Sequence, residues 1–167
     1  MRSEARILSG GVRGSTVFSS DWVYQYALGR AWDSALPPAV FVTLSPSIAT
    51  VGEDDLTVHR CGLLARSWGC GGILMVYLYA VRTVAPYELY TLADPVGPEN
   101  LMFVRHTIMQ HNPAFVVCAW GDSRLAAKQS PSFMATMADR PLSCLGRNSD
   151  GSPVEPLASH VMLTQFP

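Results

Sequence analysis

Four short apolar runs constrain the fold of this 167-residue chain more than any other feature. Each run has the length of one buried strand, and the first three are followed by polar loops and then by segments with helical spacing. Buried strands that alternate with helices are typical of a mainly parallel sheet covered on both faces. The sequence therefore predicts a three-layer α/β/α fold with a mainly parallel central sheet, whose strands are the runs 39–44, 73–79, 115–120 and 142–145.

The N-terminal residues 5–32 follow a different pattern, in which short β-prone segments are separated by Gly10-Gly11 and by Ser19-Ser20-Asp21. Turn residues between such segments predict a β-meander, which we expect to pack on an edge of the α/β core of residues 39–158. The chain has no linker or repeat, and its length suits one compact domain spanning 1–167. Helices are expected from Asp54–Asp55 to Gly69, and at 86–92, 99–110 and 123–137, where Pro131 should interrupt or restart the last one.

Composition excludes several classes of protein. Hydrophobic residues make up 49% of the chain and charged residues 15%, which argues against disorder. The net charge of −1 gives no bulk attraction for phosphate, so nucleic-acid binding would need a local basic face. No apolar run reaches the roughly 18 residues of a membrane span, and a cytoplasmic location is expected. The four cysteines form no C-x-x-C pair and are expected to be reduced thiols without a metal.

Polar and aromatic residues follow the predicted parallel strands. Because the carboxyl ends of parallel strands open on one edge of a sheet, we expect these side chains to lie close together. Carboxylates, hydroxyls, an arginine and flat rings suit a pocket for a base or another planar polar group. In strand order, the candidates are Ser45, Ser47, Asp54 and Asp55; Tyr77, Tyr79, Arg82 and Thr83; Trp120, Asp122 and Ser123; and Asn148, Asp150, Glu155 and His160.

Each candidate also has a purely structural interpretation. Asp54 and Asp55 stand where a helix begins, where acids commonly cap the first turn. Arg82 could pair with Asp94, and Trp120 could be a core aromatic. The G-x-S-x-G, Walker A, G-x-G-x-x-G and H-E-x-x-H signatures are all absent from the chain. The convergence of the candidates on one edge is therefore the main argument for a site.

The chain carries an ordered series of motifs over residues 20–158. They are Y-x-L-x-R-x-W at 26–32, L-x-P-S-x-A at 44–49, D-D-x-T-x-x-R at 54–60, L-x-A-x-R-T-x-x-P at 78–86, D-P-x-G-x-E-N at 94–100, A-W-G at 119–121 and C-L-G-x-x-x-x-G-x-P-x-x-P-L at 144–157. This series resembles a domain family of bacteria, archaea and phages whose function is unknown.

The order of the motifs also resembles the uracil-DNA glycosylase superfamily, in which strand-end loops position a water, read a flipped base and clamp DNA. The resemblance implies a DNA glycosylase that excises a modified pyrimidine, such as glucosylated hydroxymethylcytosine of phage DNA, in antiphage defence, without metal or cofactor. It implies catalytic roles for Asp54, Asp55, Glu155 and Ser45, substrate contacts for Ser47, Tyr77, Arg82, Trp120, Asn100 and Thr57, and DNA-phosphate contacts for Arg60, Arg124 and Lys128.

Gln25 replaces an arginine directly before the first motif, and three of the candidate site positions also depart from the family pattern. Ser45 and Tyr77 replace asparagines, and Glu155 replaces a histidine. These changes are consistent with an altered substrate, in which Tyr77 would stack on a different base or sugar and Asp54–Asp55 would supply the catalytic carboxylate. They are equally consistent with a catalytically inactive DNA- or nucleotide-binding module. A hydrolase of free nucleotides is the third alternative.

Overall fold

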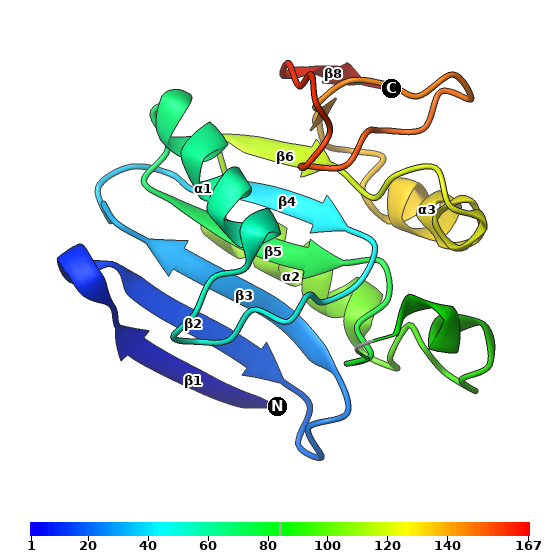
Figure 1. Cartoon of the computed structure of the whole chain (residues 1–167), viewed down its shortest axis with the longest axis horizontal. Coiled ribbons are helices and arrows are strands. Elements are labelled where there is room, and N and C mark those ends of the chain that lie inside the picture. Colours follow the sequence, from blue (N-terminus) through cyan, green and yellow to red (C-terminus); the bar gives the residue numbers. More distant parts are fainter. Residues whose placement is uncertain (84) are drawn as a thin grey trace.

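A single eight-stranded sheet runs through the computed structural model, which describes residues 1–83 and 85–167 (Figure 1). The strands stand in the order β1-β2-β3-β5-β4-β6-β7-β8. Their bounds are β1 Arg2–Ile7, β2 Arg13–Phe18, β3 Gln25–Ala31, β4 Ala39–Thr43, β5 Gly72–Tyr77, β6 Phe115–Cys118, β7 Leu142–Cys144 and β8 Thr164–Phe166. The helices are α1 Leu56–Ser67, α2 Asn100–His111 and α3 Arg124–Thr136, with 3₁₀ turns at Ser9–Gly11 and Pro86–Tyr90.

The four strands predicted from apolar runs form the parallel core of the sheet. β4 lies between β5 and β6, and Val42 is in register with Val76 on one side and with Cys118 on the other. β7 continues the parallel arrangement beyond β6. The predicted α/β class with parallel core strands is confirmed.

Antiparallel strands complete both edges of this core. The N-terminal meander β1–β2–β3 joins through β3, which pairs antiparallel with β5. The prediction that the meander packs on a sheet edge is confirmed, although its first strand begins at Arg2, before the predicted start at residue 5. At the other edge, the C-terminal β8 pairs antiparallel with β7, a strand that the sequence analysis did not predict.

The sheet is the middle of three layers because its buried side chains alternate between two cores. Phe41, Met75 and Val117 point to the side of α1, where they pack with Val58, Cys61 and Ala65. Val40, Val42 and Val76 point to the opposite side, toward residues of α2 and α3 such as Ile108 and Phe133. Figure 1 shows α1 on one face of the sheet and α2 behind the other.

The helix ends follow local capping rules. Asp55 is the N-cap of α1, where its carboxylate accepts a hydrogen bond from the Val58 N–H at 2.9 Å. Gly69 follows the end of the helix with a φ of +76°, as predicted for a glycine in that position. No helix in the described parts of the chain is long and apolar enough to cross a membrane.

The expected interruption at Pro131 is wrong, because α3 runs from Arg124 to Thr136 with Pro131 inside it. A proline removes one hydrogen bond from the helix, here the one to the carbonyl of Ala127. Both residues are exposed, so water can solvate that carbonyl. The N-cap Ser123, which accepts from the Ala126 N–H at 3.1 Å, and the buried side chains of the helix keep it continuous.

Candidate functional site

A pocket of about 280 Å³ lies at the carboxyl ends of β4, β5 and β6, and we call it the strand-end pocket. Loops after β4 and β7 and the first turn of α1 close its sides. Six of the predicted site residues line it: Ser45, Ser47, Thr57, Tyr77, Trp120 and Glu155. Met75, Ala119 and Leu157 are among its apolar walls. The topology therefore gathers residues that are up to 110 positions apart in the chain.

Glu155 supplies the only carboxylate among the residues that line this pocket. Its side chain is exposed and makes no hydrogen bond or ion pair with the described residues. It rests against Gly121, whose φ is +78° and where an added Cβ would stand 2.7 Å from Glu155 Oε1. The glycine of the A-W-G motif therefore gives the carboxylate room at the mouth of the pocket.

Tyr77 lines the pocket at the end of β5. The residue is only 3% exposed, so its ring is packed in the core and is not a free stacking surface. Its hydroxyl oxygen accepts a hydrogen bond from Nε2 of Gln25 at 3.2 Å. Burial raises the pKa of the Tyr77 phenol above its ordinary value of 10.0. The Tyr77 phenol is therefore neutral at physiological pH.

Trp120 also lines the pocket, but its ring is mostly buried. It makes edge-on contacts with Phe133 and Phe166 on the side of α3 and β8. Only a small part of the residue, which is 3% exposed, can reach a ligand. Its main contact is therefore with the core, and its role at the pocket is to form part of the wall.

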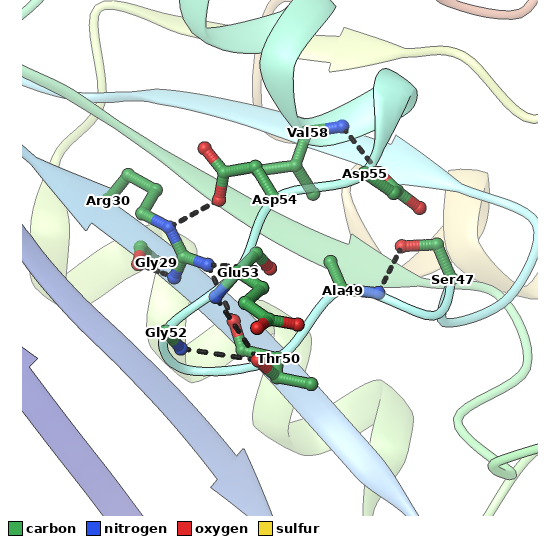
Figure 2. A network of polar contacts seen from close by, with 10 residues as sticks. All are labelled: Gly29, Arg30, Ser47, Ala49, Thr50, Gly52, Glu53, Asp54, Asp55 and Val58. Atoms are coloured by element: carbon green, nitrogen blue, oxygen red, sulfur yellow. Dashed lines mark hydrogen bonds and ion pairs between the residues drawn. The ribbon is translucent and has the colours of Figure 1, made fainter. Parts of the chain in front are cut away.

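Asp54 lies outside the strand-end pocket, in a network around the buried Arg30 (Figure 2). Nε of Arg30 donates to Asp54 Oδ1 at 2.7 Å, and its Nη2 donates to the carbonyl oxygen of Thr50 at 2.5 Å. A further Arg30 bond at 2.8 Å reaches the carbonyl of Gly29. Arg30 is 3% exposed, so these bonds fix the segment that leads into α1.

Asp55 is engaged as the N-cap of α1, as Figure 2 shows. Neither Asp54 nor Asp55 lines the strand-end pocket. The structure thus separates the two predicted carboxylates from the hydroxyl groups of Ser45 and Ser47, and it leaves Glu155 as the carboxylate that shares their cavity.

Four other predicted residues lie elsewhere at this end of the molecule. Arg82 lines a second pocket of about 730 Å³, here called the loop pocket, which meets the strand-end pocket at Pro46 and Ser47. Arg60 lies on α1, while Arg124 and Lys128 are exposed on α3. None of them lines the strand-end pocket or forms an ion pair with the described residues.

Asn100 is fully buried and has a structural role in the fold. Its Nδ2 donates to the carbonyl oxygens of Tyr77 and Leu78, at 2.8 and 3.3 Å. These bonds hold the chain where β5 ends and the loop begins. Asn100 therefore supports the backbone beneath the pocket and does not contact the cavity.

Two residues that matter to the site were not predicted. Gln25 fixes the Tyr77 hydroxyl, and Arg30 fixes the loop between β4 and α1. The only sequence signal was their place in the first motif, where Gln25 departs from the family pattern and Arg30 matches it. Both partners are distant in sequence, so spacing alone could not reveal them.

No metal or cofactor site stands out in residues 1–83 and 85–167, where no three His, Cys, Asp or Glu side chains are grouped to hold an ion. The four cysteines are free and buried. Burial raises the pKa values of the Cys61 and Cys118 thiols, so they are neutral packing residues at physiological pH.

Comparison with known proteins places the chain in a family. A family model described as "Protein of unknown function (DUF1643)" matches residues 25–157, which include every element of the strand-end pocket. Searches of curated proteins and of solved structures found no significant match. The matched region covers most of the 167 residues, and the chain therefore belongs to the DUF1643 family.

Proposed function

We propose that the protein is a DNA glycosylase that hydrolyses the N-glycosidic bond of a modified pyrimidine bound in the strand-end pocket. The observation that carries this proposal is the unpaired Glu155 carboxylate, in a residue that lines the same cavity as Ser45 and Ser47. N-glycosidic hydrolysis needs a carboxylate that activates water or stabilises the developing oxocarbenium ion. It also needs hydrogen-bond donors for the departing base.

The lining of the pocket suits a neutral planar ring. Its walls combine apolar side chains with hydroxyl groups, and no lysine, arginine or histidine lines it. Its volume of about 280 Å³ is at the small end of ligand pockets, which run from roughly 300 to 1,000 Å³. These features favour a base over a phosphate group as the occupant.

In the proposed reaction, Glu155 accepts a proton from a water molecule as the water oxygen forms a bond to the anomeric carbon. The bond between that carbon and the base nitrogen breaks, and its electron pair stays on the base. Hydroxyl donors such as those of Ser45 and Ser47 stabilise the negative charge that develops there. The proton on Glu155 can then return to the base, giving free base and an abasic sugar.

A duplex substrate would have to present its base in a flipped conformation, since the reacting bond is inaccessible in the stack. The adjoining loop pocket contains Arg82 and lies across Pro46–Ser47, where it is suited to a neighbouring nucleotide or to a bulky substituent such as a glucosyl group. Arg60, Arg124 and Lys128 are candidate phosphate contacts from the flanking helices.

The test is base release from otherwise identical duplexes that contain cytosine, uracil, hydroxymethylcytosine or its glucosylated form. We expect alkali-labile abasic sites with at least one modified base and not with cytosine. Glu155→Gln should lower the rate by about 10²- to 10⁴-fold, the usual contribution of general acid–base catalysis. Asp122→Asn is the control, because Asp122 is exposed after β6 and does not line the pocket.

The alternatives predict different results in the same assay. Salt-dependent DNA binding with no base release from any duplex would favour an inactive binding module. Release from free nucleotides but not from DNA would identify a hydrolase of small substrates. Full activity in Glu155→Gln would show that the Glu155 carboxylate is not catalytic and would contradict the proposed mechanism.

A further inference from the structure

β1 is the longer of the two edge strands of the sheet, and its outer edge is open. It pairs only with β2 among residues 1–83 and 85–167, and Figure 1 shows no element beyond it. All of its residues, Arg2–Ile7, are exposed. Proteins protect an edge with short strands, prolines or bulges, but β1 has neither a proline nor a shift in register, and only the other edge strand, β8, is short. β1 is therefore the edge that a further strand can join.

The register of the β1–β2 hairpin shows which backbone groups face this open edge. The Leu8 N–H donates to the Val12 carbonyl at 2.7 Å, in continuation of the register that pairs Arg6 with Gly14. Backbone groups of an antiparallel strand point alternately toward one neighbour and toward the other. The N–H and C=O groups of Arg6 therefore also point to β2, and those of alternate residues point outward. The outward-pointing groups belong to Ser3, Ala5 and Ile7.

We propose that two copies of the chain form a dimer in which their β1 strands pair antiparallel, around a two-fold axis at Ala5. The outward groups of Ala5 then bond to those of Ala5 in the second copy, and Ser3 exchanges hydrogen bonds with Ile7 of the second copy. The two sheets become one continuous sheet, which is association by strand addition. The partner is a second copy of this chain, and the interaction surface is the β1 edge.

The charges on β1 favour a second copy as the partner. Glu4 and Arg6 form no ion pair within the described parts of the chain. With the axis at Ala5, Glu4 lies opposite Arg6 of the second copy, and the symmetry repeats this pair. Both pairs occupy non-hydrogen-bonded positions of the new ladder, where opposite side chains come closest. The strand is thus complementary to itself in charge as well as in its backbone groups.

The neighbouring registers are less favourable. An axis at Glu4 or at Arg6 would place that residue opposite its own copy, with like charges in contact. An axis at Ser3 would pair Arg2 with Glu4 but would leave the outward groups of Ile7 without a partner. The proposed register therefore combines unlike charges with the longest ladder.

The symmetry closes the assembly and leaves the strand-end pockets open. Both copies use the same edge, so the contact is isologous and ends at two copies. β2 and β3 lie between β1 and β5, so the interface does not reach the pocket. The two-fold axis is perpendicular to the sheet and reverses the strands of the second copy, so the two pockets open at opposite ends of the joined sheet. The inference is therefore independent of the proposed function, and base release per chain should be the same in monomer and dimer.

Analytical ultracentrifugation of the full chain, at concentrations up to about 1 mM, tests the dimer. We expect a reversible equilibrium between monomer and dimer. Ala5→Pro should abolish the dimer, because it removes the N–H at the axis. This variant should still fold, since an edge strand tolerates a proline whose N–H would face solvent, and circular dichroism checks that it does.

Charge reversal tests the register. Glu4→Arg and Arg6→Glu should each raise the dissociation constant of the dimer about tenfold, because like charges then lie opposite each other twice. The double variant Glu4→Arg/Arg6→Glu restores unlike pairs and should dimerise like the unmodified chain, a repair that a folding defect would not show. Lys128→Glu is the control, since it reverses an exposed charge on α3 and changes the net charge as Arg6→Glu does.

Amide hydrogen exchange adds a readout at single residues. The N–H groups of Ser3, Ala5 and Ile7 should exchange more slowly as the protein concentration rises, whereas that of Arg6, which already faces β2, should change little. A chain that stays monomeric throughout the concentration range, that assembles beyond the dimer, or that dimerises equally well as Ala5→Pro would overturn the inference. A double charge variant that dimerises no better than the single variants would overturn the proposed register.

Discussion

Arg30 shows how a single buried side chain organises the loop before α1. Its guanidinium bonds to the backbone carbonyl of the neighbouring Gly29 and to two partners distant in sequence, the Asp54 carboxylate and the Thr50 carbonyl. The carboxylate of Asp54 is 37% exposed, so solvent weakens its share of the network. Most of the stabilisation therefore comes from the bonds to carbonyl groups.

Arg30→Met should lower the free energy of unfolding by about 3 kcal/mol, because it leaves a carboxylate and buried carbonyls without their donor. Asp54→Asn should lower it by only about 1 kcal/mol, since a neutral oxygen can still accept the bond. Urea unfolding of both variants measures the difference. The base-release assay on the same variant tests whether Asp54 is catalytic. An Asp54→Asn protein that is folded but inactive would support the catalytic role predicted for Asp54 from the sequence.

Gly121 is the residue on which the position of Glu155 depends. Gly121→Ala combines a strained φ of +78° with a Cβ that overlaps the Glu155 carboxylate. It should lower stability by about 1–2 kcal/mol and reduce base release. Gly151→Ala is a matched control, because its φ is +86° but an added Cβ meets nothing within 4 Å. Equal activity of the two variants would show that Gly121 has only a backbone role.

At the scale of secondary structure, α1 contains a glycine that the fold does not require. Gly62 lies in the middle of the helix, and an added Cβ would meet nothing within 4 Å. Gly62→Ala should therefore raise the free energy of unfolding by about 0.5–1 kcal/mol. Gly69→Ala should lower it by a similar amount, because Gly69 ends the helix with a φ of +76°. Thermal or urea unfolding of the pair tests the sign of both effects.

The elements that could be predicted are those that local chemistry determines. Asp55 begins α1 and Gly69 follows its end because capping needs only neighbouring residues. β8 was missed because Thr164–Phe166 is short and partly exposed, and it becomes a strand only by pairing with β7. Pro131 was misjudged because the exposed surface of α3 tolerates a lost hydrogen bond that a buried helix would not.

At the scale of the whole molecule, the position of the strand ends predicts some residues of the strand-end pocket but not all of them. The parallel order of β4, β5 and β6 brings Ser45, Tyr77 and Trp120 to one pocket, as a strand-end rule predicts. That rule could not assign Asp54, which is drawn away by Arg30 on β3, or Asn100, which turns inward. Hydrogen bonds to residues distant in sequence therefore determine which candidates line the pocket and which hold the surrounding backbone.

The core as a whole predicts how stability depends on alkaline pH. Burial raises the pKa values of the Cys61 and Cys118 thiols above 9.0 and that of the Tyr77 phenol above 10.0. Above these ordinary pKa values, the unfolded chain loses protons that the folded chain retains. The contribution of these groups to the free energy of unfolding is therefore constant below pH 9. Above the ordinary pKa of each group, this contribution falls by about 1.4 kcal/mol per pH unit.

Urea unfolding between pH 7 and pH 11 measures this loss. Cys118→Ala should reduce the slope from pH 9 upward, whereas Tyr77→Phe should reduce it only above pH 10, because the phenol of the unfolded chain titrates later than the thiol. Cys144→Ala is a control, because Cys144 is also buried, on the neighbouring β7. Its effect at pH 7 measures how far the cavity left by a buried thiol lowers the free energy of unfolding. If the free energy of unfolding stayed constant to pH 11, these groups would have the same pKa values in the folded and unfolded chains. That result would contradict the prediction, because their burial in the two cores disfavours the charged forms.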